Sequence, residues 1–138
     1  MLSTYEDLAD PKWKGKIAIR SSKNIYNQSL LASIIAHDGE EAAAAWAKGV
    51  VNNFARVPRG NDNDQAKAIA VGIGDIAVMN TYYIGRMSSS RVTGDKKVIE
   101  NIGVFFPNQE GRGTHINISG AAVAKYSKNK ENAIKYIE

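Results

Sequence analysis

Three tyrosines lie in polar segments that each lead into a helix. The segment NIYNQ contains Tyr26, and the segment MNTYYIGR contains Tyr82 and its neighbour Tyr83. A phenol has a pKa of about 10, so it is a poor ligand for most divalent metals at neutral pH. A hard trivalent ion such as ferric iron changes this, because its charge drives an oxygen ligand to lose its proton. The residue types therefore allow a phenolate metal site, and equally aromatic packing or a stacking platform for a sugar.

The elements that would position these tyrosines alternate between strands and helices. Alternating or buried apolar runs predict the strands, and apolar residues at helical spacing predict the helices. The predicted strands cover residues 16–20, 54–57, 75–80, 104–107 and 111–125. The predicted helices cover residues 4–10, 30–37, 40–53, 61–72, 81–90 and 129–138, with a further helical turn within 90–103. This order is typical of an α/β fold with a mostly parallel central sheet flanked by helices.

Ligands of such folds bind beyond the carboxyl ends of the parallel strands. Three polar loops follow predicted strands and begin helices, at residues 20–28, 59–64 and 80–86. Tyr26, Tyr82 and Tyr83 all fall within these loops. The topology therefore directs the three phenols to one edge of the sheet.

Composition excludes several other classes of protein. The net charge is +4, but the basic residues are scattered and not interleaved with aromatic ones, so a nucleic-acid partner is not expected. No run reaches the roughly 18 apolar residues that a membrane-spanning helix requires, so no membrane insertion is expected. The absence of cysteine removes thiolate catalysis, thiolate metal sites and disulfides.

The chain also lacks the residue groups of an enzyme. No G-x-S-x-G motif is present, and His37 and His115 lie outside the three loops, so we expect no catalytic triad and no enzyme. We interpret His115 as a structural or hinge residue. Asp62 and Asp64 resemble part of a calcium loop, but the glycine and distal glutamate are missing, so helix capping is the better interpretation.

Long stretches of the chain resemble the periplasmic ferric-iron-binding proteins of bacterial ABC importers, above all the group with the cyanobacterial iron-uptake proteins. The resemblance covers nearly the whole chain in order, and the NTYY and NIYNQ segments are its most specific parts. The stretches are TYEDLADPKWKGKIAIR, SSKNIYNQSLLASIIAHDGEEAAAAWAKG, RGNDNDQAKAIAVGIGDIAVMNTYYIGRM and GTHINISGAAV.

This resemblance implies the fold of a class II periplasmic binding protein, in which two lobes enclose the ligand. Residues 1–113 would form the second, C-terminal lobe, and residues 114–138 a return strand and helix that lead toward the hinge and the first lobe. The abrupt ends of the chain suggest a piece of a longer protein. The remaining metal ligands would then come from the missing N-terminal lobe.

The resemblance also implies a set of site residues. Tyr26, Tyr82 and Tyr83 would bind Fe(3+) as phenolates, and some relatives add a synergistic anion such as carbonate. Residues suited to support the phenolates or to hold that anion are Arg86, Asn80, Ser22 and Asn61, with Ser21 and Asp62 among the other polar residues of these loops.

The function implied is capture of ferric iron and its delivery to the permease of an ABC importer, with the parent protein in the periplasm. The alternative is a solute-binding lobe for an organic cation or an oxyanion, of the polyamine, thiamine or sulfate type. In that case the tyrosines would contact the solute directly and no metal would be needed.

Overall fold

The chain folds around a short pair of parallel strands, as seen in a computed structural model that describes residues 1–138. Strand β1 (Ile17–Ala18) pairs in parallel with β2 (Ile76–Ala77). Phe54 adds a single parallel bridge to Ile17. The α/β class and the parallel direction of pairing are thus confirmed, although the sheet is smaller than the sequence predicts.

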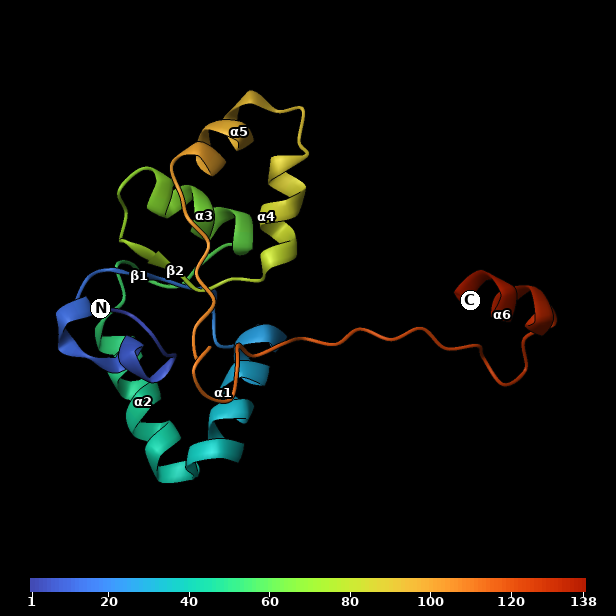
Figure 1. The fold of residues 1–138 in the computed structure, drawn as a ribbon, viewed down its shortest axis with the longest axis horizontal. Coiled ribbons are helices and arrows are strands. Elements are labelled where there is room, and N and C mark those ends of the chain that lie inside the picture. The colour runs from blue at the N-terminus through green and yellow to red at the C-terminus, as the bar shows by residue number, and fades with distance from the viewer.

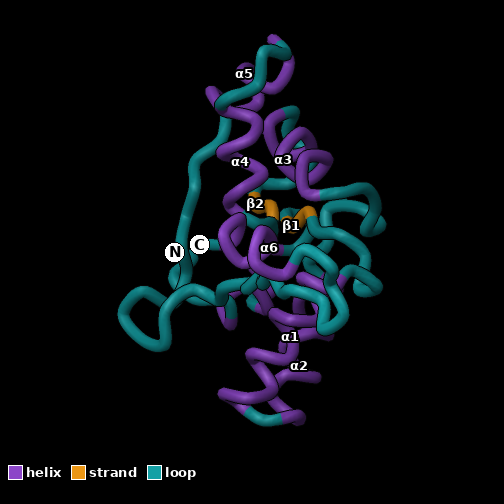
Figure 2. Tube along the Cα trace, turned by 90° about the vertical axis from the view of Figure 1, so that its right-hand side faces the viewer, coloured by secondary structure: helices purple, strands orange, loops and turns teal.

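Helices gather on two sides of this strand pair (Figures 1 and 2). One side holds the 3₁₀ helices η1 (Glu6–Ala9) and η2 (Pro11–Trp13) with α1 (Ile25–Asp38) and α2 (Glu40–Asn52). The other side holds α3 (Asp62–Ala70), α4 (Thr81–Ser88) and α5 (Thr93–Glu100). Helix α6 (Lys130–Ile137) stands apart at the end of an extended segment (Figure 1). None of these helices is both long and apolar enough to cross a bilayer.

Each side has its own buried core. On the side of α1 and α2, Leu8, Ile17 and Val50 pack together, and Trp46 joins this group to the one around Ile34. The indole Nε1 of Trp46 also donates a hydrogen bond of 2.7 Å to the backbone oxygen of Tyr5. These contacts fix α1 and α2 against the N-terminal segment, because burying apolar surface is favourable and the polar indole group finds a partner.

The second core lies between α3, α4 and α5. Ala66, Met87 and Val98 are buried there, one residue from each helix. Met87 is only 2% exposed, so α4 is held by the face that carries Met87. The face with Tyr82, the second residue of α4, is left toward the cleft.

Glycines set two of the chain reversals. Gly39 separates α1 from α2 with a φ of 86°, as the Asp38–Gly39 pair predicts. Gly74 leads into β2 with a φ of 83°, and a Cβ atom there would come within 2.6 Å of the backbone oxygen of Lys16. Only glycine suits that position, because both the left-handed backbone and the close approach exclude a side chain.

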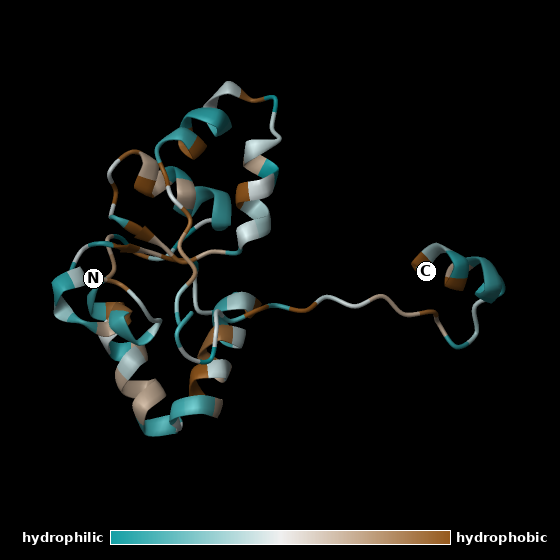
Figure 3. Cartoon of the chain, in the orientation of Figure 1, coloured by the Kyte–Doolittle hydropathy of each residue, from teal (hydrophilic) through white to brown (hydrophobic).

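Three of the predicted strands do not form. Residues 54–57 contribute only the Phe54 bridge, and residues 104–107 and 111–125 are extended or turn segments without strand pairing. Their apolar side chains find little cover, since Phe105 is 52% and Ile118 is 86% exposed. Figure 3 shows brown, apolar residues along both extended segments. The prediction of strands was wrong here because a strand needs a partner, and no other strand lies beside these segments.

Candidate functional site

The first tyrosine lies in the opening turn of α1. Asn24 caps this helix, and its side-chain oxygen accepts a hydrogen bond of 3.0 Å from the backbone nitrogen of Tyr26. Asn27 turns back and donates to the backbone oxygen of Arg20 at 2.8 Å. The predicted loop of residues 20–28 is therefore partly wrong, because the Asn24 cap lets the helix begin at Ile25, five residues before the apolar periodicity suggests.

The other two tyrosines lie in the opening turn of α4. Asn80 is the N-cap residue, but its side chain makes no capping bond to the helix. Its backbone nitrogen instead donates to Asp62 Oδ1 at 2.9 Å, and its side-chain oxygen accepts from Asn117 Nδ2 at 2.6 Å. The start of α4 is thus held by residues from elsewhere in the chain.

The three phenol rings meet at one place, as the sheet-edge rule predicts. The ring centres of Tyr26 and Tyr82 are 6.4 Å apart and nearly perpendicular, at 81°. The rings of Tyr82 and Tyr83 are 4.5 Å apart with an angle of 32° between their planes. Helices α1 and α4 therefore bring together two tyrosines from sequence positions 56 residues apart with a third beside them.

The hydroxyl groups of these tyrosines influence one another. Desolvation raises the pKa of Tyr82 above its ordinary value, and hydrogen bonding with the Tyr26 and Tyr83 hydroxyls raises it further. The cluster without an ion therefore favours protonated phenols, and a cation of high charge is needed to displace their protons.

Arg20 is the arginine that contacts the tyrosines. Its guanidinium carbon lies 5.7 Å from the centre of the Tyr26 ring, and its Nη1 is 2.5 Å from Asp62 Oδ2. Partial burial opposes its charge, yet the pKa of Arg20 is raised, because hydrogen bonds to Asp62 and to the Tyr83 hydroxyl favour the protonated guanidinium. Arg20 thus places a fixed positive charge beside the phenols, which favours their ionised form.

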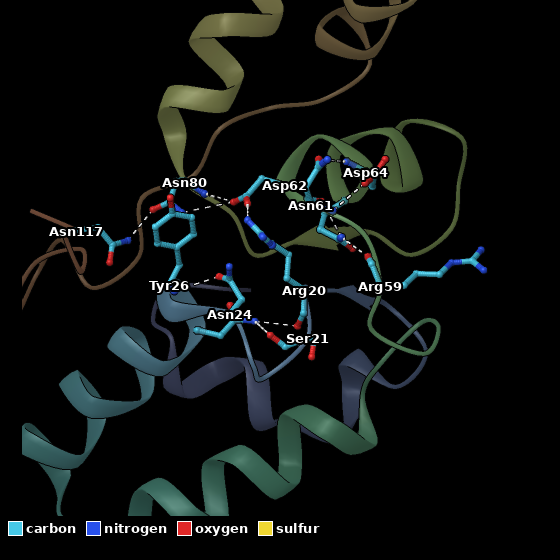
Figure 4. Close-up of polar contacts among 12 residues, drawn as sticks. Arg20, Ser21, Asn24, Tyr26, Arg59, Asn61, Asp62, Asp64, Asn80 and Asn117 are labelled. Atoms are coloured by element: carbon cyan, nitrogen blue, oxygen red, sulfur yellow. Dashed lines mark hydrogen bonds and ion pairs between the residues drawn. The ribbon is translucent and has the colours of Figure 1, made fainter. Parts of the chain in front are cut away.

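Asp62 is the residue whose role the sequence did not reveal. It is only 1% exposed, and its two oxygens bind Arg20 and the backbone nitrogen of Asn80 (Figure 4). Helix α3 is capped instead by Asn61, which exchanges hydrogen bonds with Asp64 in a capping box. The capping interpretation was right for Asp64 but wrong for Asp62. A buried carboxylate joined to two of the three loops could not be inferred from a local pattern.

The other predicted supporting residues are placed less centrally. Asn61 is occupied by the α3 cap. Ser22 is exposed, and only its backbone oxygen is bonded, by Gln28. Arg86 is exposed and forms neither a hydrogen bond nor an ion pair, but it lies four residues after Tyr82 and so shares its face of α4. Of the four predicted residues, only Asn80 belongs to the hydrogen-bond network beside the phenols.

A cleft of about 700 Å³ opens beside the tyrosines. Tyr26, Tyr82, Arg20 and Asn80 are among its lining residues, together with many apolar residues such as Phe105, whereas Tyr83 does not line it. His115 and Asn117 also line it, although the sequence placed His115 outside the binding loops. The extended segment that carries them passes beside the start of α1, a position that only the folded chain reveals (Figure 1).

No conventional metal-binding cluster competes with the tyrosines. Nowhere do three side chains of the types His, Cys, Asp and Glu gather closely enough to hold an ion. The two acidic residues that line the cleft are already paired, Asp62 with Arg20 and Asp75 with Lys16. The clustered phenols are therefore the oxygen donors best placed to hold an ion beside the cleft, and anionic oxygen suits a hard ion.

Comparison with known protein families shows which family has this sequence pattern. Residues 3–138 match the family described as bacterial extracellular solute-binding protein. Iron uptake protein A1 of Synechocystis is 59% identical over 137 residues, which cover 99% of this chain and 38% of that protein. The chain thus spans about two fifths of the length of this relative.

Solved structures agree with this comparison. A Trichodesmium protein called IdiA or FutA, in complex with iron and citrate, is 61% identical with a TM-score of 0.92. That match covers 98% of this chain and 43% of the other. A ferric binding protein from Campylobacter jejuni is 51% identical with a TM-score of 0.90, and the match again covers 98% of this chain and 43% of the other. The arrangement of residues 1–138 is therefore that of one portion of these larger proteins.

Proposed function

The chain belongs to the bacterial extracellular solute-binding proteins, and we propose that it binds ferric iron through the phenolates of Tyr26, Tyr82 and Tyr83. The family consists of solute-binding proteins rather than enzymes, as the sequence led us to expect. The observation that carries the proposal is the meeting of three phenol rings from two helix starts, with Tyr26 and Tyr82 lining one cleft and Tyr83 packed against Tyr82. Relatives named for ferric iron binding and iron uptake support it.

Phenolate ligands would make this site selective for the ferric ion. The raised pKa of Tyr82 means that its proton leaves only when a strong positive charge takes its place. Each phenolate that binds iron releases one proton, so the affinity for iron should increase with pH. Acid, or reduction to the less highly charged ferrous ion, should weaken binding and favour release.

Delivery to an importer completes the proposed function. We propose that residues 1–113 form the C-terminal lobe of a periplasmic protein, and that residues 114–138 lead toward the hinge and the N-terminal lobe. The N-terminal lobe would supply the remaining ligands and close over the iron by a hinge motion. The loaded protein would then hand its iron to the permease of an ABC importer. The length of the relatives, more than twice that of this chain, supports the two-lobed parent.

Carbonate is the anion that we propose as an additional partner of the iron. Asn61 and the backbone nitrogen of Asn80 are already bonded within the protein, which leaves Ser22 and Arg86 free to meet an anion. Arg20 Nε is also buried without a hydrogen-bond partner, and it is a further donor beside the phenols. Titrations with ferric iron in bicarbonate-free and bicarbonate buffers test this part, since participation requires tighter binding with bicarbonate.

The decisive test is a titration with a ferric chelate, followed by visible absorbance. Phenolate bound to ferric iron should give a charge-transfer band in the wild type. The double variant Tyr82→Phe with Tyr83→Phe should lose most of this band, and Tyr26→Phe part of it. The control is Tyr126→Phe, because Tyr126 is 86% exposed and lies outside the cleft. A colourless wild type, or a double variant with the full band, would contradict the proposal.

Arg86 allows a finer test of the same site. We propose that its charge helps to neutralise the phenolates, since it shares a helix face with Tyr82. Arg86→Ala should weaken ferric binding more at low salt than at high salt, because exposed charges are screened by salt. Arg91→Ala, which removes an exposed arginine between α4 and α5, is the matched control.

The second candidate function is binding of an organic cation or an oxyanion. The apolar part of the cleft and its volume of about 700 Å³ favour it, because sites for small organic molecules are mostly apolar and of this size. Calorimetry with polyamines, thiamine and sulfate in the presence of a metal chelator distinguishes the two. Tight binding there, without a ferric band, would favour this candidate.

A further inference from the structure

A closed ring of polar contacts surrounds the tyrosine cluster. On the α1 side, Ser29 Oγ and His115 Nε2 share a hydrogen bond of 2.9 Å. Ser29 lies three residues after Tyr26, within the same opening turns of α1. Burial lowers the pKa of His115, so its imidazole is neutral at neutral pH. His115 therefore attaches the extended segment to the helix that carries the first tyrosine.

On the α4 side, the same segment reaches the second helix start. Asn117 Nδ2 donates to Asn80 Oδ1 at 2.6 Å, and Asn80 directly precedes the turn with Tyr82 (Figure 4). From Asn80 the contacts continue to Asp62 and then to Arg20. Arg20 returns to α1 through Asn27, which completes the ring.

The short segment Thr114–Asn117 is the one part of this ring that joins α1 to α4 directly. The segment is extended, and side chains alternate along an extended chain, so that residues two apart lie on the same side. His115 and Asn117 both bond to the lobe, whereas Ile116 and Ile118 are 70% and 86% exposed. We call Thr114–Asn117 the strap.

We propose that His115 and Asn117 are positioning residues, through which the strap sets the separation of Tyr26 from Tyr82 and Tyr83. This inference rests on the proposed ferric site and extends it to two residues outside the three proposed ligands. The strap makes one side-chain bond to each helix, His115 to Ser29 of α1 and Asn117 to Asn80 before α4, and a single residue separates the two. A displacement of the strap must therefore move one helix start relative to the other, or break a bond.

A consequence concerns the chain that follows. Beyond Asn117 the chain leaves the lobe, and α6 stands apart from it (Figure 1). Any force on residues 118–138 acts on the strap first, and through it on the two helix starts. The position of this outgoing chain and the geometry of the phenols are then coupled in both directions, because a coupling free energy is reciprocal.

The test compares His115→Ala and Asn117→Ala with the wild-type chain. The control is Ile118→Ala, which lies next to Asn117 but forms no side-chain hydrogen bond. Each of the two strap variants should weaken ferric binding by about threefold to tenfold, the effect of one lost hydrogen bond. The charge-transfer absorbance per bound iron should also fall, because displaced phenols leave fewer phenolates bound to each iron. His115→Gln, whose amide can still bond to Ser29, should restore most of both quantities.

A double-mutant cycle separates positioning from a general loss of stability. If the Ser29–His115 bond acts as proposed, Ser29→Ala with His115→Ala should weaken binding no more than either change alone. Additive effects, or binding and absorbance per iron equal to those of Ile118→Ala, would overturn the inference. Thermal unfolding of each variant shows that the measured differences come from folded protein.

A measurement without metal tests the inference independently of the ferric site. The perpendicular rings of Tyr26 and Tyr82 should shift each other's proton NMR signals in the metal-free chain. Asn117→Ala and His115→Ala should change these shifts, and Ile118→Ala should leave them as they are. Unchanged shifts in the strap variants overturn the inference. A colourless wild type with changed shifts would instead reject the proposed function and leave the positioning role supported.

Discussion

The two tyrosine-bearing helices start from nearly the same three residues but are held in different ways. Helix α1 begins at Asn24-Ile25-Tyr26, and α4 begins at Asn80-Thr81-Tyr82. Asn24 caps its own helix through its side chain. Asn80 makes no such cap, and it is held by Asp62 on one side and by Asn117 on the other.

This difference separates local from long-range control of one site. Tyr26 depends on a cap two residues away in sequence, whereas Tyr82 depends on residues 20 and 35 positions away. A cap can be replaced by any residue that accepts the same hydrogen bond. A bond within a buried network has no such substitute, because its other members are left without partners when it is lost. The same asparagine therefore has two different roles.

Removal of the buried carboxylate should have the largest effect. Asp62→Ala leaves Arg20 without its partner, so we expect a loss of about 3 kcal/mol in the free energy of unfolding. Urea denaturation measures it. Asp75→Ala is the matched control, because Asp75 pairs with Lys16 where both side chains are about half exposed, and an exposed pair of this kind contributes about 0.5 kcal/mol. Equal losses in the two variants would show that the buried pair does not hold the site.

The same substitution at both asparagines directly tests the comparison. Asn24→Asp keeps a capping oxygen, so stability should change by less than about 0.5 kcal/mol. Asn80→Asp puts a second carboxylate beside Asp62, whose Oδ1 lies 3.5 Å from Asn80 Nδ2. Repulsion between these like charges should destabilise the fold by about 2 kcal/mol. Urea denaturation of both variants at neutral pH is the measurement, and similar values would remove the distinction between local and long-range control.

Loss of the local cap should have a smaller and more confined effect. Asn24→Ala should reduce stability by about 1 kcal/mol and fray the first turn of α1. Amide exchange should then become faster at Tyr26 and Asn27 but stay unchanged at Tyr83. Asn24→Ser, which restores a capping oxygen, should return the exchange rates to those of the wild type. Faster exchange at Tyr83 would indicate that the two helix starts are coupled more tightly than we infer.

A local carboxylate near the N-terminus should respond to acid without involving the site. Hydrogen bonds from the backbone nitrogens of Ser3 and Thr4, and from the Ser3 hydroxyl, lower the pKa of Asp7 to about 2. Because the folded pKa lies below the usual 3.8, the stabilisation is complete above that value and is lost as pH falls through about 2. Amide exchange at Ser3 and Thr4 should therefore accelerate over this interval, and Asp7→Asn should exchange rapidly at every pH.

The helices were the most predictable part of the fold. Asp38-Gly39 ended α1 as predicted, and the alanine-rich run of α2 and the capped start of α3 were recognised from short-range signals. The strands were less predictable, since residues 104–107 form an apolar run that suits a strand but have no neighbouring strand. Helix formation depends on bonds within the segment, whereas a strand's bonds lie with other segments.

The site shows the same division. Strand ends and helix starts were enough to bring Tyr26, Tyr82 and Tyr83 together in the prediction, and the structure confirms their proximity. The sequence drew attention to Arg86, while the structure places Arg20 against the rings. Arg20 had no local signal, because its partner Asp62 lies 42 residues further along the chain.

By itself, the sequence determined the α/β class, the glycine break after α1, the capped start of α3, and the edge of the sheet to which the phenols belong. These features follow from local conformational preferences and from the direction of parallel strands. Only the tertiary structure decided the pairing of Arg20 with Asp62, the support of Asn80, and the position of the strap across both helix starts. Such contacts join residues far apart in sequence, and their geometry depends on how the two cores pack against the strand pair.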